Sequence, residues 1–220
     1  MAAGQWKFPK KIIESDRFSI INNGIITDKY AFSEETRSEY RKNLELNDTF
    51  TICQVGRFAP EKNHGFTLSV LERLKEKNFN FKCIFVGDGL LKQEITEKVK
   101  RLNLIQDVVF LERRNDIAEI MTASDICLFP SVFEGLGMTV IEAQATGLKT
   151  IMSENVPDDV ILTDLVVKLP TDNLDAWVEE IIGSEKTVNR AGYNSIIENS
   201  EFNAEKIAND LEKFYKGYNK

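Results

Sequence analysis

Short apolar runs alternate with longer amphipathic stretches along most of the 220-residue chain. The runs are rich in β-branched and aromatic residues, and they predict seven strands, near 18–22, 50–56, 81–87, 107–112, 125–130, 149–153 and 165–169. The stretches between them predict helices near 62–77, 89–102, 115–123, 138–146 and 174–182. Because the runs at 50–56 and 81–87 are almost continuously apolar, helices are expected on both faces of the sheet. The pattern predicts an α/β fold with a single Rossmann-like, doubly wound parallel sheet.

The C-terminal part of the chain continues as helix. Apolar residues recur at helical spacing and predict an amphipathic helix near 203–218. Its apolar stripe either packs on its own domain or docks on a partner outside this chain, and the sequence leaves both open. We expect a Rossmann-like domain over 18–185, a remnant of an interdomain segment over 1–17 and a C-terminal helical extension over 186–220.

Composition narrows the classes of partner and compartment. With 28 Lys and Arg against 35 Asp and Glu, the net charge is -7, which argues against a nucleic-acid partner and leaves only local anion sites. Cys53, Cys83 and Cys127 lie far apart within apolar runs, so we expect buried free thiols, not a metal cluster. The N-terminal residues lack the apolar core of a signal peptide. The sequence predicts a cytoplasmic protein.

Ligands of open α/β sheets bind at the carboxyl ends of strands, so the residues that follow each predicted strand carry the candidate chemistry. After the run at 50–56, Gly56 and Arg57 are followed by Lys62. The planar guanidinium and the compact ammonium together suit a diphosphate. The alternative is a pair of solvated surface charges.

A second strand end carries Gly87 and Gly89. The dinucleotide fingerprint GxGxxG requires a further glycine where Lys92 stands, and it belongs to the first strand of the fold, not the third. The two glycines therefore indicate either close approach of the backbone to another ligand or a tight turn.

The third strand end is the most informative. A strand that ends at Pro130 leads into a loop carrying Glu134 and then into a helix from about Gly137 to Gly147, so that loop amides and the helix N-terminus form an anion site. Glu142 lies among apolar helix positions, where burying a carboxylate is costly unless a polar group meets it. Glu142 lies about 7 to 8 Å along the helix axis from Gly137, so a nucleoside diphosphate sugar is long enough to reach both carboxylates. Alternatively, Glu134 caps the helix and Glu142 is half exposed.

Five motifs occur in a fixed order along the chain. They are Asn22-Asn23-Gly24-Ile25, Gly56-Arg57 with Lys62, Val86-Gly87-Asp88-Gly89, Pro130-Ser131 with Phe133-Glu134-Gly135, and Glu142-Ala143-Gln144-Ala145-Thr146-Gly147. Together they resemble the C-terminal, donor-binding half of retaining GT-B glycosyltransferases of family 4, of the bacterial capsule and exopolysaccharide type. The resemblance covers about 18–182, and Glu134 and Glu142 match the E-x7-E signature of that family.

The resemblance implies an activity and a role for each matched position. It implies transfer of a hexosyl group from a nucleotide sugar, such as a UDP-sugar, to a saccharide or lipid-linked acceptor, without a metal or other cofactor. Catalytic roles would fall to Glu134, Arg57 and Lys62. Substrate-binding roles would fall to Gly56, Gly87, Gly89, Ser131, Gly135, Leu136, Gly137, Met138, Thr139 and Glu142.

The resemblance also implies a missing partner. Only the donor half is matched, so an N-terminal acceptor-binding half would precede it, with Trp6-Lys7-Phe8 as a remnant of the connecting segment. The terminal helix near 203–218 would resemble the crossover helix that packs on that half. We expect this chain to bind donor nucleotide with little turnover, and the full-length enzyme to associate peripherally with the inner membrane face. Ile26 departs from the Asp that the family commonly has there, and we assign it no role.

Several alternatives stay open. His64 is either a general base or a helix-start packing residue, and Arg113 and Arg114 lie either near the nucleoside base or on the surface. A Rossmann oxidoreductase and a catalytically silent partner domain are the rival functions.

Overall fold

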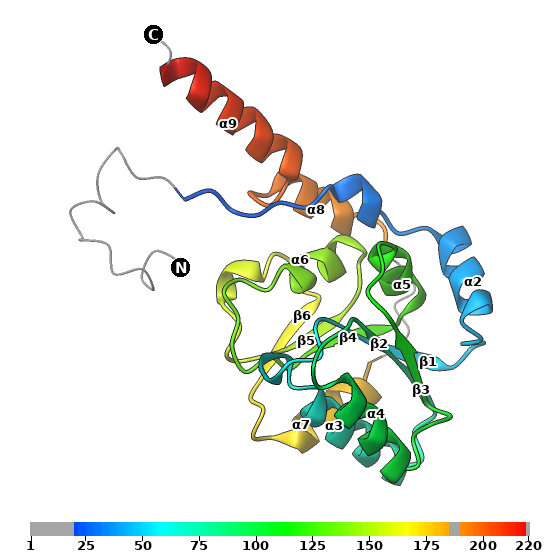
Figure 1. Cartoon of the computed structure of the whole chain (residues 1–220). Coiled ribbons are helices and arrows are strands. Elements are labelled where there is room, and N and C mark those ends of the chain that lie inside the picture. Colours follow the sequence, from blue (N-terminus) through cyan, green and yellow to red (C-terminus); the bar gives the residue numbers. More distant parts are fainter. Residues whose placement is uncertain (1–19, 185–189, 219–220) are drawn as a thin grey trace.

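The chain folds around one parallel sheet of six strands. The computed structural model describes residues 20–184 and 190–218 (Figure 1). The sheet has the spatial order β3-β2-β1-β4-β5-β6, and all neighbouring strands are parallel. Its strands are β1 (Phe50–Val55), β2 (Phe81–Val86), β3 (Val108–Leu111), β4 (Ile126–Phe129), β5 (Thr150–Ser153) and β6 (Val166–Leu169). This order reverses direction between β1 and β4, as in a doubly wound Rossmann-like sheet, and confirms the predicted fold class.

Helices cover both faces of the sheet. One face carries α3 (His64–Glu76), α4 (Lys92–Arg101) and α7 (Leu174–Ile182). The other carries α2 (Glu34–Asn43), α5 (Ile117–Ala123), α6 (Met138–Ala145) and α8 (Tyr193–Asn199), and α9 (Ala204–Tyr218) projects from it (Figure 1). Short 3-10 turns are η2 (Thr27–Tyr30), η3 (Pro60–Lys62) and η4 (Asp158–Val160).

Successive strand residues point into opposite core layers. In β1, Ile52 packs with the layer of α3, α4 and α7, whereas Cys53 packs with the layer that contains α5. In β2, Phe85 and Ile84 divide in the same way. Because both faces are covered, most positions of these strands are apolar, which explains the nearly continuous runs in the sequence. Cys53, Cys83 and Cys127 are buried free thiols, as predicted.

The predicted strand at 18–22 is wrong over residues 20–22, the part of it that the structure describes. Residues 18 and 19 lie outside the described residues, and residues 20–22 form no strand. Ile20 and Ile21 are 53% and 55% exposed, and their neighbour in space is α9 rather than the sheet. A single bridge from Ile25 to Asn203 is the β contact of this segment. A short apolar run therefore signals a contact surface here, not a strand.

Three predicted helix starts are too early, because α3, α4 and α5 begin at His64, Lys92 and Ile117 rather than at 62, 89 and 115. Two helices are missing from the prediction. Asn63 has a left-handed conformation that separates η3 from α3, and Gly89 packs on the backbone of Phe58 before α4 begins. The prediction contained neither α2 nor α8. For α2 a signal is present, because Ser33 accepts a hydrogen bond from the Thr36 amide as an N-cap at 3.2 Å.

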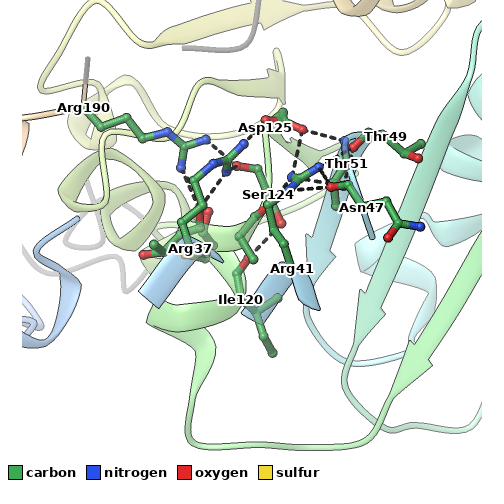
Figure 2. Close-up of polar contacts among 12 residues, drawn as sticks. Arg37, Arg41, Asn47, Thr49, Thr51, Ile120, Ser124, Asp125 and Arg190 are labelled. Carbon is green, nitrogen blue, oxygen red and sulfur yellow. Dashed lines mark hydrogen bonds and ion pairs between the residues drawn. The ribbon is translucent and has the colours of Figure 1, made fainter. Parts of the chain in front are cut away.

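A cluster of arginines around Asp125 ties α2 and the segment before α8 to the start of β4 (Figure 2). The buried Asp125 carboxylate accepts from Arg37 at 2.5 Å, from the Thr51 amide at 2.8 Å and from Arg41 at 3.4 Å. Arg41 also donates to the Ala123 carbonyl, and Arg190 donates to the Ser124 carbonyl at the end of α5. The sequence reading did not identify this cluster, which fixes the amino end of β4.

The C-terminal extension both packs and projects. Phe202 is fully buried in a core cluster with residues of α6, whereas Phe214 and Tyr215 on α9 are exposed. A groove of about 370 Å³ between α9 and the N-terminal segment is lined by Ile20, Ile21 and Leu211 among others. The predicted remnant over 1–17, with Trp6-Lys7-Phe8, lies outside the described residues. Across the part of the chain that the structure describes, no helix has the length and apolarity of a membrane span.

Candidate functional site

The loops after β1 and β4 meet at the point where the strand order reverses. β1 and β4 are adjacent and parallel, so their carboxyl ends lie side by side. The Val132 amide, after β4, donates to the Glu61 carbonyl, after β1, at 2.9 Å. In an open α/β sheet this crevice is where ligands bind. Two of the three strand ends chosen from the sequence therefore form one site.

Lys62 and Glu134 form an ion pair between these two loops. The Lys62 ammonium lies 2.5 Å from Oε1 of Glu134, and the two side chains are 18% and 13% exposed. The ammonium also lies 4.7 Å from the centroid of the Phe129 ring, at the end of β4. The lysine is thus held at the site, and its charge already has one partner.

Arg57 is not part of this pair. Its guanidinium binds Glu61, four residues on, at 2.9 Å, and its side chain is 77% exposed. The structure therefore separates the two cations that the sequence grouped together, because Lys62 pairs with Glu134 between the loops, whereas Arg57 is exposed and pairs with Glu61.

The glycines after β1 and β2 serve the packing of the two loops. A Cβ on Gly87 would lie 2.1 Å from the Gly56 carbonyl oxygen, and one on Gly89 would lie 2.6 Å from the Phe58 carbonyl oxygen. A Cβ on Gly56 would meet the methylenes of Lys62 at 3.3 Å. Close packing on the backbone of the loop after β1 explains why Gly87 and Gly89 lack side chains, and Gly56 makes room for Lys62. The substrate-binding roles of these three glycines stay predictions.

The segment from Ser131 to Thr139 leads from β4 into α6. The Ser131 carbonyl accepts a hydrogen bond from the Ser153 hydroxyl. The Ser131 hydroxyl is buried and has no hydrogen-bond partner among the described residues. Gly135 is open, with no atom within 4 Å of a Cβ position, and Gly137 adopts a left-handed φ of +105° just before Met138. Leu136 and Met138 are partly buried against the α6 core, and Thr139 is partly exposed. The first amides of a helix lack intrahelical partners, so the segment around Gly135 to Met138 is a candidate anion site.

Glu142 meets a polar partner, as its position among apolar residues requires. The Tyr30 hydroxyl donates to its Oε1 at 2.8 Å. Burial raises the pKa of the Glu142 carboxyl, and the hydrogen bond from Tyr30 acts in the opposite direction. Sequence reasoning missed Tyr30, which lies 112 positions away and has no charge or motif of its own to mark it.

His64 and the two arginines after β3 lie outside the crevice contacts. His64 is buried, stacks on Phe58 with ring centroids 4.3 Å apart, and has both ring nitrogens unpartnered among the described residues. Burial and the charge of Lys62 lower its pKa to about 4, so it is neutral at pH 7. This favours the packing role. Arg113 is exposed, and Arg114 pairs with Asp116 at 2.5 Å.

The arrangement suits an extended anionic ligand. A lysine ammonium and the amides at the start of α6 supply positive charge at one point, and two carboxylates flank it, one before the helix and one in its second turn. Anionic groups would lie at the helix end, and hydroxyl groups would lie near each carboxylate.

Known sequences share this pattern. Residues 36–196 match the family model described as "Glycosyl transferases group 1". The chain is 34% identical over 185 residues to the putative glycosyltransferase EpsF of Bacillus subtilis (strain 168). The aligned region covers 81% of this chain and 47% of EpsF. It is 32% identical over 145 residues to a UDP-Gal:alpha-D-GlcNAc-diphosphoundecaprenol alpha-1,3-galactosyltransferase of Escherichia coli, covering 64% and 38%. The chain spans about half the length, or less, of these relatives.

Solved structures share the fold. Anabaena HepE in complex with UDP and glucose matches 90% of this chain with a TM-score of 0.73 at 20% identity, over 56% of its own length. WaaG, a glycosyltransferase involved in lipopolysaccharide biosynthesis, matches 90% of this chain with a TM-score of 0.74 at 20% identity, over 57% of its own length.

Proposed function

Because the chain belongs to the group 1 glycosyl transferase family, we propose that it is the donor-binding half of a retaining glycosyltransferase. In this proposal a nucleoside diphosphate sugar binds at the carboxyl ends of β1 and β4, and the full-length enzyme transfers its hexosyl group to a saccharide or lipid-linked acceptor. The observation that carries the proposal is the ion pair of Lys62 with Glu134 in the crevice before α6.

Each part of the donor has a complementary group. The diphosphate would lie over the N-terminus of α6, where it meets the amides around Gly135 to Met138 and the Lys62 ammonium. Glu134 would accept hydrogen bonds from hydroxyls of the donor sugar, and Glu142 would accept hydrogen bonds from the ribose hydroxyls. The Arg57 side chain is exposed and pairs with Glu61, so its contribution is expected to be smaller than that of Lys62.

The same groups would act in catalysis. As the bond between the anomeric carbon and the β-phosphate oxygen breaks, negative charge grows on the leaving diphosphate and the sugar becomes oxocarbenium-like. Lys62 and the helix amides would stabilise that charge, so electrostatic preorganisation replaces a covalent nucleophile or a metal in this proposal. The acceptor oxygen would form its bond to the anomeric carbon from the face that the diphosphate leaves.

The names of relatives support a uridine donor and a surface-polysaccharide context. The E. coli relative uses UDP-Gal and a diphosphoundecaprenol acceptor by its name, and HepE was solved with UDP and with UDP-glucose. We propose a UDP-sugar donor and a cytoplasmic enzyme that works at the inner membrane face.

The acceptor-binding half is the proposed intramolecular partner. The groove between α9 and Ile20 and Ile21, and the exposed Phe214 and Tyr215, would pack on that half. Without it, this chain should bind donor nucleotide and turn over little or none.

Titration calorimetry of the chain with UDP, GDP and NAD tests the proposal. Binding of UDP or GDP, unaffected by EDTA, is expected. Binding of NAD alone would favour a Rossmann oxidoreductase, which Lys92 and the packing of Gly87 and Gly89 already disfavour. Absence of binding by all three would favour a silent partner domain.

A further inference from the structure

Tyr30 fixes the orientation of the carboxylate in the second turn of α6. Its hydroxyl donates to Oε1 of Glu142 at 2.8 Å. The other oxygen, Oε2, accepts no hydrogen bond from residues 20–184 or 190–218. A carboxylate has about four acceptor positions, so one oxygen is held by the protein while the other stays open to a ligand.

The position of Tyr30 does not depend on a ligand. Tyr30 is the last residue of η2, and Thr27, the first residue, is buried. The Thr27 carbonyl accepts a hydrogen bond from the Asn194 side chain at 2.7 Å. Asn194 belongs to α8, and Ile25, just before η2, is bridged to Asn203. The Tyr30 ring itself packs against two core clusters. The hydroxyl is therefore presented to Glu142 by an anchored turn.

The surrounding charges keep Tyr30 a neutral donor. Burial and the negative charge of Glu142, together with their hydrogen bond and the charge of Glu119 on α5, raise the pKa of the Tyr30 phenol above its usual value. Lys29 and Glu119 line a cavity of about 310 Å³ together with Tyr30. The negative charge of Glu142 also contributes to raising the pKa of the buried Cys127 thiol on β4. For Glu142 the hydrogen bond opposes the effect of burial and favours the ionised carboxylate.

We propose that Tyr30 is a positioning residue for ribose recognition: it holds Glu142 with one carboxylate oxygen open toward the vicinal hydroxyls of the donor ribose. This inference rests on the proposed function, because it assigns the ribose to Glu142. An ionised and oriented carboxylate accepts hydrogen bonds from a diol without first reorganising, which is the advantage that the Tyr30 hydroxyl supplies.

Calorimetry of the 220-residue chain with UDP and with 2′,3′-dideoxyuridine 5′-diphosphate tests the assignment. Tyr30→Phe should weaken UDP binding by roughly threefold to tenfold, which is the size of one ordinary hydrogen bond, because Tyr30 acts on the ligand only through Glu142. It should leave the affinity for the dideoxy analogue unchanged, because that ligand has no ribose hydroxyls. Equal weakening of both ligands would overturn the inference while leaving nucleotide binding intact. Failure of the unsubstituted chain to bind UDP would overturn both the inference and the proposed uridine donor.

Two further variants separate positioning from folding. Tyr193→Phe removes a tyrosine hydroxyl that interacts with Asp164 at another cavity, and it should change neither affinity. In a Glu142→Gln background, Tyr30→Phe should no longer discriminate between the two ligands. If the selective loss persisted in that background, Tyr30 would not act through Glu142.

Discussion

The Lys62 ammonium lies 2.5 Å from Oε1 of Glu134, although the two residues are 72 positions apart in the chain. The pair joins the loop after β1 to the loop after β4 at the point where the strand order reverses. One of three ammonium hydrogens is engaged by the carboxylate, so the others remain for a phosphate.

Lys62→Met should weaken UDP binding by about tenfold to a hundredfold, because it removes a charge-assisted hydrogen bond and a positive charge. Calorimetry measures the loss. Lys75→Met is the matched control, since Lys75 pairs with Asp107 at 2.7 Å outside the crevice, and it should leave the UDP affinity unchanged. Equal affinities for Lys62→Met and the unsubstituted chain would contradict the assignment.

Glu142→Gln should weaken UDP binding by about tenfold and yet increase the free energy of unfolding at pH 7. Burial raises the pKa of this carboxyl above its ordinary value of 4.5, so the folded state binds the proton more tightly than the unfolded state. Ionising it therefore lowers stability as the pH rises above about 4.5, and the variant escapes this loss. Urea unfolding at pH 4 and pH 7 checks the sign. Collapse of the fold with unchanged affinity in the folded fraction would make Glu142 structural.

His64→Phe should flatten the acid dependence of stability. The folded-state pKa is lowered to about 4 from 6.5, so the unfolded state binds more protons between these values. The stability that His64 contributes is complete above pH 6.5 and is lost as the pH falls to about 4, by on the order of 3 kcal/mol. The difference in unfolding free energy between the chain and the variant, measured across this window, isolates the contribution. An identical slope for both proteins would argue against a buried neutral imidazole.

Asp125→Asn should destabilise the fold by about 3 to 5 kcal/mol, because Arg37 and Arg41 lose the buried carboxylate that they pair with (Figure 2). The surface pair of Arg73 and Asp175 provides the control, and Asp175→Asn should change stability by less than about 1 kcal/mol. Chemical denaturation compares the two. A similar small effect for both would mean that the cluster is not a source of stability.

The sheet was predictable because its signal is local. Continuous apolar runs mark strands that are covered on both faces, and Ile52 and Cys53 show the two faces in adjacent residues. The run at 20–22 has the same local pattern but packs near α9, and only tertiary contacts distinguish the two cases. Asp125 and its arginines were missed for the same reason, since their partners come from distant segments.

The site was predictable in part. Strand ends followed by Lys62 and Glu134 were identified from sequence, and the strand order brings them together. The partner of Arg57 and the close packing of Gly87 depend on the exact loop conformations, which residue type alone does not encode. The role of Tyr30 was not predictable, because its contact with Glu142 depends on the packing of η2 against α8 and α6.

A crystal structure of the chain in complex with UDP would show where the diphosphate binds. We expect it within hydrogen-bond distance of the Lys62 ammonium and of the amides at the start of α6, with the ribose hydroxyls on Glu142. A diphosphate bound at another edge of the sheet, with the Lys62 and Glu134 pair unchanged and solvent over α6, would contradict it.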